Sequence, residues 1–261
     1  MDQIRSRDLP LPDPALEAEA FRPFHTDPGW DEAWWWLVLP VAIAAFLIGV
    51  YAMAPEWYKA WVFPEGYGLQ ELFHYFVPLI GFVIAIRLLR RPFVQSRGLV
   101  RAVCWVGVVS CFYIAGEEHS YGQHFFHWET PEFWKAINRQ NETNLHNTTD
   151  WLDKKPRTVL EVFIFGGCLA MSLVSLFTGW VRRNRWSLFI PAATLVPTAL
   201  GALLFKLSAT FTNEFATPAL VFRPAESTET FMYLFIVLYL VIFARRVQAL
   251  EAQEAAGGAA T

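Results

Sequence analysis

The sequence predicts an all-α polytopic membrane protein, a bundle of about six transmembrane helices with a helical loop on its outer face. Hydrophobic residues make up 54% of the 261 positions, and aromatic residues make up 16%. Charged residues make up only 17%, against about 25% in an ordinary soluble domain. Six apolar windows of roughly 20 residues, the length that crosses a bilayer, lie between polar stretches. A soluble globule and a disordered chain are therefore excluded.

The six windows are separated by short connections, except for one long segment between the third and the fourth. The first window has no basic region before it and no small-residue cleavage site after it, so we expect a retained span. The chain then divides into a cytoplasmic leader (1–33), a six-span membrane domain (34–246) with an outer-face motif loop (116–157), and a flexible cytoplasmic tail (247–261). The expected spans are approximately 34–54, 69–88, 99–115, 159–181, 186–207 and 230–244.

Lys and Arg residues are unevenly divided between the two sides of this membrane domain. The side that carries the amino terminus receives 13 of them, and the opposite side receives 7. Basic residues favour the cytoplasmic side, and the short loops 87–101 and 182–185 carry the most weight. We therefore expect both termini to be cytoplasmic.

Charge and cysteine content exclude two further classes of function. The formal net charge of −3 provides no basic field, so we expect no nucleic-acid partner. Cys104, Cys111 and Cys168 all lie in apolar runs without the spacing of a zinc site. We interpret them as small buried hydrophobic residues rather than as a disulfide framework.

Titratable side chains gather on the predicted outer side. A carboxylate at the end of a span is costly, and it usually faces a bundle interior, a partner or water. The outer side is therefore the expected functional face. The histidines that map there are His74, His119, His124, His127 and His146, and the carboxylates at the outer span ends are Glu71, Glu117, Glu118, Glu161, Glu226 and Glu229.

Helical spacing groups these residues further. Glu71 and His74 are i and i+3, so they share a helix face. Glu142 and His146 share a face if 130–147 contains a helix, for which Thr130 as cap and Pro131 in the first turn provide a start. Two longer stripes follow from the same spacing. One is formed by Tyr113, Glu117, Tyr121 and His124 if the third span continues outward, and the other, which enters the sixth span, is formed by Glu226, Glu229 and Tyr233.

This set of residues suits a divalent metal ion, for which zinc, iron and manganese are the candidates. Helical di-metal sites use single glutamates and ExxH pairs, and Glu71 with His74 is such a pair. A mononuclear zinc site with an open water position fits equally well. A hydrogen-bonded pair that stabilises the span end is the structural alternative. The expected metal ligands are Glu71, His74 and His146, the expected catalytic residues are Glu117, Glu118 and Glu142, and the expected substrate-binding residues are Gln123, Asn144 and Asn147.

The motif loop carries a distinctive pattern. It runs Gly116-Glu-Glu-His-Ser-Tyr-Gly-Gln123, then Thr130-Pro131, then Asn138, Gln140, Glu142 and Asn144-Leu-His-Asn147. This pattern resembles a bacterial family of uncharacterised multi-pass membrane proteins that reads approximately GEEISWGQ, a TP turn and NxQxExNLHN. The chain departs from it at His119 and Tyr121. The resemblance implies a bacterial inner-membrane protein with Glu117, Glu118, Gln123, Glu142, Asn144, His146 and Asn147 as its signature, and it implies no reaction.

Two hypotheses of function follow. The first is a metal-dependent enzyme whose outer-facing site acts on a membrane lipid or another amphipathic substrate. The second is a non-catalytic subunit or assembly factor of a larger membrane complex, in which the motif is a hydrogen-bonded clasp. Ion translocation ranks last, because the first, fourth and fifth spans have few polar residues near their centres.

Overall fold

Helices and turns make up the described part of the chain. The computed structural model describes residues 27–64, 66–178 and 185–258, and no strand occurs within these ranges. The predicted all-α class is confirmed. The segments that form the bundle are, in chain order, η3 (Trp34–Val38) with α2 (Leu39–Met53), α4 (Leu69–Leu89), α6 (Gly98–Glu118), α9 (Asp150–Glu161) with η7 (Val162–Ala170) and α10 (Met171–Thr178), α12 (Val196–Phe215) and α13 (Pro224–Gly258).

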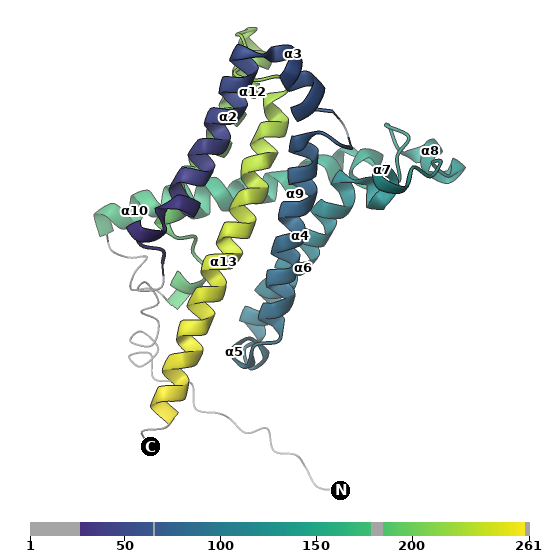
Figure 1. Cartoon of the computed structure of the whole chain (residues 1–261). Coiled ribbons are helices and arrows are strands. Elements are labelled where there is room, and N and C mark those ends of the chain that lie inside the picture. The colour runs from purple at the N-terminus through teal and green to yellow at the C-terminus, as the bar shows by residue number, and fades with distance from the viewer. Residues whose placement is uncertain (1–26, 65, 179–184, 259–261) are drawn as a thin grey trace, which may run out of the picture.

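Short helical turns form the connections. Four of them fold the motif loop, which projects from the side of the bundle (Figure 1). The turns are η2 (Trp30–Glu32), α3 (Pro55–Trp57), η4 (Tyr58–Val62), α5 (Pro92–Gln95), η5 (Ser120–Gly122), α7 (Gln123–Phe126), α8 (Glu132–Ile137), η6 (His146–Thr148), η8 (Arg185–Leu188) and η9 (Ala193–Leu195).

Within the described residues, six helical segments are long and apolar enough to cross a membrane. They overlap the six predicted windows, so the chain is an integral membrane protein with an all-α polytopic bundle. The segments are Trp34–Met53, Leu69–Leu89, Gly98–Glu118, Lys154–Ser175, Trp186–Phe215 and Pro224–Ala256.

Helix α13 is the central element of the bundle. It packs against both α4 and α12 and runs along the length of the structure (Figure 1). Phe231, Phe235 and Phe243 are almost fully buried on it. The helix continues to Gly258, through most of the segment expected to be a flexible tail. Glu251 explains part of this extension, because its carboxylate accepts a hydrogen bond from the backbone N–H of Phe93 at 3.0 Å.

A close approach of two helices makes Gly201 a sensitive position. A Cβ atom at Gly201 of α12 would overlap the ring of Phe231 on α13. Gly201→Ala is therefore expected to lower the free energy of unfolding by about 1–3 kcal/mol through overpacking. Thermal unfolding in detergent measures the loss. Gly166→Ala is the matched control, since nothing lies within 4 Å of a Cβ atom there, and an equal loss in both variants would contradict the packing argument.

The fourth apolar segment lies differently from the others. The rod formed by α9, η7 and α10 crosses the long axis of the bundle in Figure 1, whereas the six-span prediction implied helices running alongside one another. Its middle part packs against the bundle, because η7 contacts α12 and buries Ile164 and Cys168. Val159 and Val162 on the same rod are largely exposed, as side chains that face lipid are.

Two arginines tie the last residues of the leader to α13. Arg245 binds both carboxylate oxygens of Glu32, at 2.6 and 2.9 Å. Arg246 is 1% exposed and pairs with Asp27, and its Nη1 also donates to backbone carbonyls of 187–190. Residues 27–32 and the carboxyl-terminal half of α13 therefore lie at the same end of the bundle.

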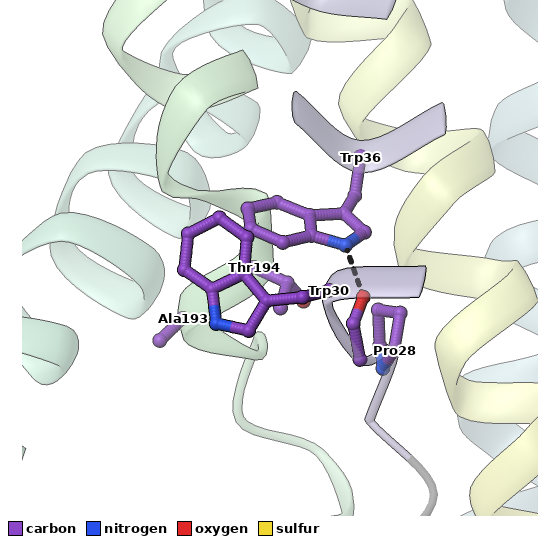
Figure 2. A pocket seen from close by; sticks show the side chains of 6 residues that line it. Pro28, Trp30, Trp36, Ala193 and Thr194 are labelled. Carbon is purple, nitrogen blue, oxygen red and sulfur yellow. Dashed lines mark hydrogen bonds between the residues drawn. The ribbon is translucent and has the colours of Figure 1, made fainter. Parts of the chain in front are cut away.

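A shallow pocket of about 260 Å³ lies at this same end, lined by Pro28, Gly29, Trp30, Trp36, Ala193 and Thr194 (Figure 2). Trp36 donates its indole N–H to the carbonyl of Gly29 at 3.0 Å, which holds one wall of the pocket. Trp30 is the other aromatic wall and is mostly exposed. No titratable side chain lines the pocket, so it lacks the groups that proton transfer requires.

Candidate functional site

A carboxylate and imidazole cluster forms where α4, α6 and α13 meet. Single ligand atoms of Glu71, His74 and Glu118 all lie within 4.8 Å of one another. His74 is fully buried, and its Nδ1 is 3.2 Å from Oε2 of Glu118. Tyr233 donates its hydroxyl to the other oxygen of Glu118 at 2.7 Å. The predicted pair on α4 is thus joined by one glutamate from α6.

The second ring nitrogen of His74 faces a chain of neutral polar groups. Nε2 of His74 is 2.8 Å from the hydroxyl of Thr230 on α13. Gln70 donates to the same hydroxyl at 3.0 Å and to Ser227 at 3.3 Å. Tyr58 in turn donates to the amide oxygen of Gln70 at 3.4 Å. The imidazole is therefore held from both sides.

Two carboxylates of α13 complete the cluster. Glu226 and Glu229 also bring ligand atoms within 4.8 Å of each other and of His74. This confirms the predicted stripe at the start of that helix. Arg157 of α9 donates to Glu229 at 2.7 Å and is 3.4 Å from Glu161. The cross-lying rod thus reaches the cluster through one guanidinium.

Glu117 points away from this cluster although it is adjacent to Glu118. It is 4% exposed and accepts hydrogen bonds from the hydroxyl of Tyr121 at 2.8 Å and from the backbone N–H of Leu145 at 2.7 Å. Burial and the Glu117 carboxylate raise the pKa of Tyr121, which keeps the phenol protonated as a donor. Two neighbouring glutamates therefore serve two different networks.

The second network is a clasp that folds the motif loop back on itself. Glu142 accepts from Ser120 at 2.8 Å and from the side-chain amide of Asn144 at 2.7 Å. Gln123 accepts from the backbone N–H of Thr143 at 2.8 Å. Asn144 is fully buried and also accepts from Asn138 at 2.7 Å. Most of the motif's polar side chains thus bind one another.

The clasp surrounds a strained turn at the end of α6. Ser120, Tyr121 and Gly122 have φ angles of +47°, +55° and +105°. Residues other than glycine rarely adopt a positive φ angle. Each such residue costs on the order of 1–3 kcal/mol of folding free energy, and contacts with its surroundings must compensate this cost. The hydrogen bonds of Ser120 and Tyr121 to Glu142 and Glu117 provide that support.

Two local predictions about this loop are wrong. The turn ends α6 at Glu118, so the expected stripe through Tyr121 and His124 does not continue along one helix. The helix expected within 130–147 is limited to Glu132–Ile137. Thr130 donates its hydroxyl to the carbonyl of Asn141 instead of capping that helix. Glu142 consequently lies in a turn and shares no helical face with His146.

The predicted site residues therefore fall into two groups. Glu71, His74 and Glu118 come together in the cluster, whereas Glu117, Gln123, Glu142 and Asn144 belong to the clasp. Asn147 donates to the side chain of Gln140 at the rim of the loop. The side chain of His146 lies outside the described part of the structure.

Several cluster residues were missing from the sequence prediction. Gln70 lies four residues before His74, and Thr230 lies four residues after Glu226, so both share a face with a predicted residue. Neither side chain is titratable, so the pattern of carboxylates and imidazoles did not indicate them. Arg157 was missed because its position on α9 gives no sign that the rod reaches α13.

His119 is buried between the two networks. Its ring stacks on Phe125 at 4.3 Å and meets Tyr75 edge-on at 4.6 Å. Neither ring nitrogen has a hydrogen-bond partner among the described residues. Burial, followed by the nearby imidazole of His124, lowers the pKa of His119 to about 4, so the ring is neutral at pH 7.

His119→Phe is expected to stabilise the protein. Phenylalanine keeps the stacking on Phe125 and removes unpaired polar atoms, whose burial costs about 1–3 kcal/mol. Thermal unfolding in detergent should show a higher melting temperature. His124→Phe is the control, because Nε2 of His124 lies 3.3 Å from Ser120 and 3.5 Å from Glu142, so that variant should be less stable. A destabilised His119→Phe protein would show that the imidazole has a polar role.

Comparison with known proteins finds no matching family model, no matching curated protein and no matching solved structure.

Proposed function

We propose that this integral membrane protein is a metal-dependent enzyme that hydrolyses a lipid or another amphipathic substrate at the cluster between α4, α6 and α13. One observation carries the proposal: an imidazole and four carboxylates converge at the end of apolar helices, in two overlapping triads around His74. One imidazole with several carboxylates is a donor set suited to zinc, iron or manganese.

The charge of the cluster supports a cation. Glu71, Glu118, Glu226 and Glu229 bring four carboxylates to the cluster, whereas the arginines beside it are Arg157, which donates to Glu229, and Arg223, which lies near Glu226. The side chains of Glu118 and Glu229 are only 15% and 21% exposed. Carboxylates held out of water are costly unless a cation or a proton compensates them. A divalent ion would supply this compensation.

The cluster also contains the groups that hydrolysis requires. A divalent ion held by His74 and the neighbouring carboxylates would supply the activation of a water molecule and the polarisation of the bond to be cleaved. Glu226 lies beside His74 and can accept the proton of the attacking water. The water oxygen then bonds to the carbonyl carbon of the substrate, the ester or amide bond breaks, and the leaving group takes up that proton. Tyr233 orients Glu118 through their hydrogen bond.

The surroundings of the cluster favour an amphipathic substrate. Apolar side chains remain exposed on the helices next to it, including Phe76 and Ile80 of α4 and Val159 and Val162 of the cross-lying rod. Such surfaces are solvated by lipid tails when a helix lies in a bilayer. A substrate with an apolar tail would reach the cluster from this side. We also propose that the membrane is the bacterial inner membrane, that the cluster faces the periplasm and that both termini are cytoplasmic.

Metal analysis of the purified protein tests the proposal. The protein is extracted in detergent, stripped with a chelator and reloaded separately with zinc, manganese or ferrous iron. We expect it to retain at least one of these ions after gel filtration. A lipid extract incubated with the loaded and the stripped protein should show a product, by mass spectrometry, only with the loaded form. Glu132→Gln on the exposed helix α8 is the matched control and should behave as the parent protein. Retention of none of the three ions would overturn the proposal.

One observation favours a second function, that of a non-catalytic subunit or assembly factor of a larger membrane complex. The polar side chains of the motif loop bind one another, as Glu142, Asn144, Gln123 and Ser120 do, and a fully satisfied network specifies one packing. This reading predicts stable copurification with other membrane subunits after mild solubilisation. Detection of the protein without bound subunits in native mass spectrometry would count against this second function.

A further inference from the structure

The two triads of the cluster share His74 but use different carboxylates. Glu71 and Glu118 complete the first triad, and Glu226 and Glu229 complete the second. An imidazole offers one lone pair to a metal ion, and the opposite ring nitrogen then carries the hydrogen. The hydrogen bonds around the ring therefore indicate which nitrogen is available to an ion.

The Nε2 side of the ring is occupied by Thr230. A threonine hydroxyl has one hydrogen to donate and two lone pairs to accept with. Thr230 is 3.2 Å from the carbonyl oxygen of Glu226, is 2.8 Å from Nε2 of His74 and accepts from Gln70 at 3.0 Å. If Nε2 carries the ring hydrogen, Thr230 donates to the carbonyl of Glu226 and accepts from both His74 and Gln70. The hydroxyl hydrogen and both oxygen lone pairs then take part in hydrogen bonds.

The same hydroxyl also supports the other tautomer of His74. Thr230 can instead donate to Nε2, in which case Nδ1 carries the hydrogen and donates it to Glu118. When the ring hydrogen moves from Nδ1 to Nε2, the Thr230 hydroxyl hydrogen rotates from Nε2 to the carbonyl of Glu226, so the Nδ1 lone pair becomes available without the loss of a partner at Nε2. A valine at position 230 would offer neither arrangement.

The distance on the Nδ1 side suits two ligands of one ion. Nδ1 of His74 and Oε2 of Glu118 are 3.2 Å apart. Ligands that each lie about 2.0–2.1 Å from a metal, at tetrahedral or octahedral angles, are separated by roughly 2.8–3.4 Å. Glu229 of the second triad is instead engaged by Arg157 at 2.7 Å.

We propose that His74 binds the ion through Nδ1 together with Glu71 and Glu118, and that Thr230, supported by Gln70, is a positioning residue that holds the Nε2–H tautomer. This inference rests on the proposed metal function. It adds the ligand atom, the choice of triad and a role for two neutral residues outside the ligand set.

Metal affinity of Thr230 variants tests the inference. Thr230→Val in the full chain is expected to weaken binding of zinc or manganese by about 10–100-fold, the usual effect of losing the partner of a ligating histidine. Thr230→Ser keeps the hydroxyl and should restore the affinity of the parent protein to within a few-fold. Thr228→Val is the matched control, because the buried hydroxyl of Thr228 donates to the carbonyl of Pro224 within α13 and Thr228 is not part of either triad. The melting temperature of each metal-free variant verifies that it is folded.

A second comparison distinguishes the triads. Glu71→Gln should reduce metal binding strongly, and Glu226→Gln should reduce it less. The inference is overturned if Thr230→Val binds the ion as tightly as Thr228→Val, or if Thr230→Ser binds it as weakly as Thr230→Val. It is also overturned if Glu226→Gln loses the ion while Glu71→Gln keeps it. The proposed metal function fails separately, if the parent protein binds none of the ions.

Discussion

Glu118→Gln is expected to abolish the proposed binding of a divalent ion at the cluster while leaving the protein folded. Glutamine keeps the size of the side chain and an oxygen that can accept from Tyr233, but it lacks the negative charge that binds a cation. Metal affinity should fall by more than about 100-fold, since loss of an outer partner alone costs about 10–100-fold. Isothermal titration of the stripped protein with zinc or manganese measures this change.

Glu117→Gln is the control from the adjacent position. Its carboxylate binds Tyr121 and the backbone N–H of Leu145 within the clasp, so this variant should keep the ion. It should lose about 1–3 kcal/mol of unfolding free energy, as expected for weakened hydrogen bonds to a charged group. Equal loss of metal in both variants, or full retention in Glu118→Gln, would contradict the separation of cluster and clasp.

Arg246→Met is expected to be the most destabilising of these substitutions. The guanidinium is 1% exposed and joins Asp27 to the backbone carbonyls of Ser187 and Ile190. Its removal leaves the Asp27 carboxylate and these carbonyls without their donor, and breaking a buried pair in this way costs about 3–5 kcal/mol. Denaturant unfolding in detergent micelles should show the loss.

Two variants separate the causes of that effect. Arg245→Met removes a more exposed arginine from the next position, whose side chain is 37% exposed, and should be much less destabilising. Arg246→Met combined with Asp27→Asn removes the unpaired carboxylate and should recover part of the stability. A neutral effect of Arg246→Met would show that the segment at 27–32 does not depend on this anchor.

The helices of this protein were predictable because a bilayer imposes a simple rule of length and polarity. Six apolar windows between charged residues located six helical segments. The ends were less predictable. Glu251 of α13 accepts a hydrogen bond from Phe93 of α5 and so supports the extension of α13. This contact joins distant parts of the chain, and local composition does not reveal it.

The cluster was predictable in part for a similar reason. Glu71 with His74, and Glu226 with Glu229, share helix faces by their spacing alone. Adjacent positions on one helix already point Glu117 and Glu118 in different directions. The partners of Glu117 were not predictable, because they depend on the left-handed turn at 120–122 and on Leu145, which approaches from a distant part of the loop. Spacing predicts which residues share a face, and it does not predict what lies opposite that face.

The order in which the chain is made has a consequence for the cluster. Glu71 and His74 are synthesised early, Glu118 follows, and Thr230 and Tyr233 come from the last long helix. During translation the imidazole of His74 therefore remains without its Thr230 partner until α13 has entered the membrane. The assembled cluster is consequently a marker of complete insertion: a chain truncated before Pro224 holds two of the helices that build it and lacks the third.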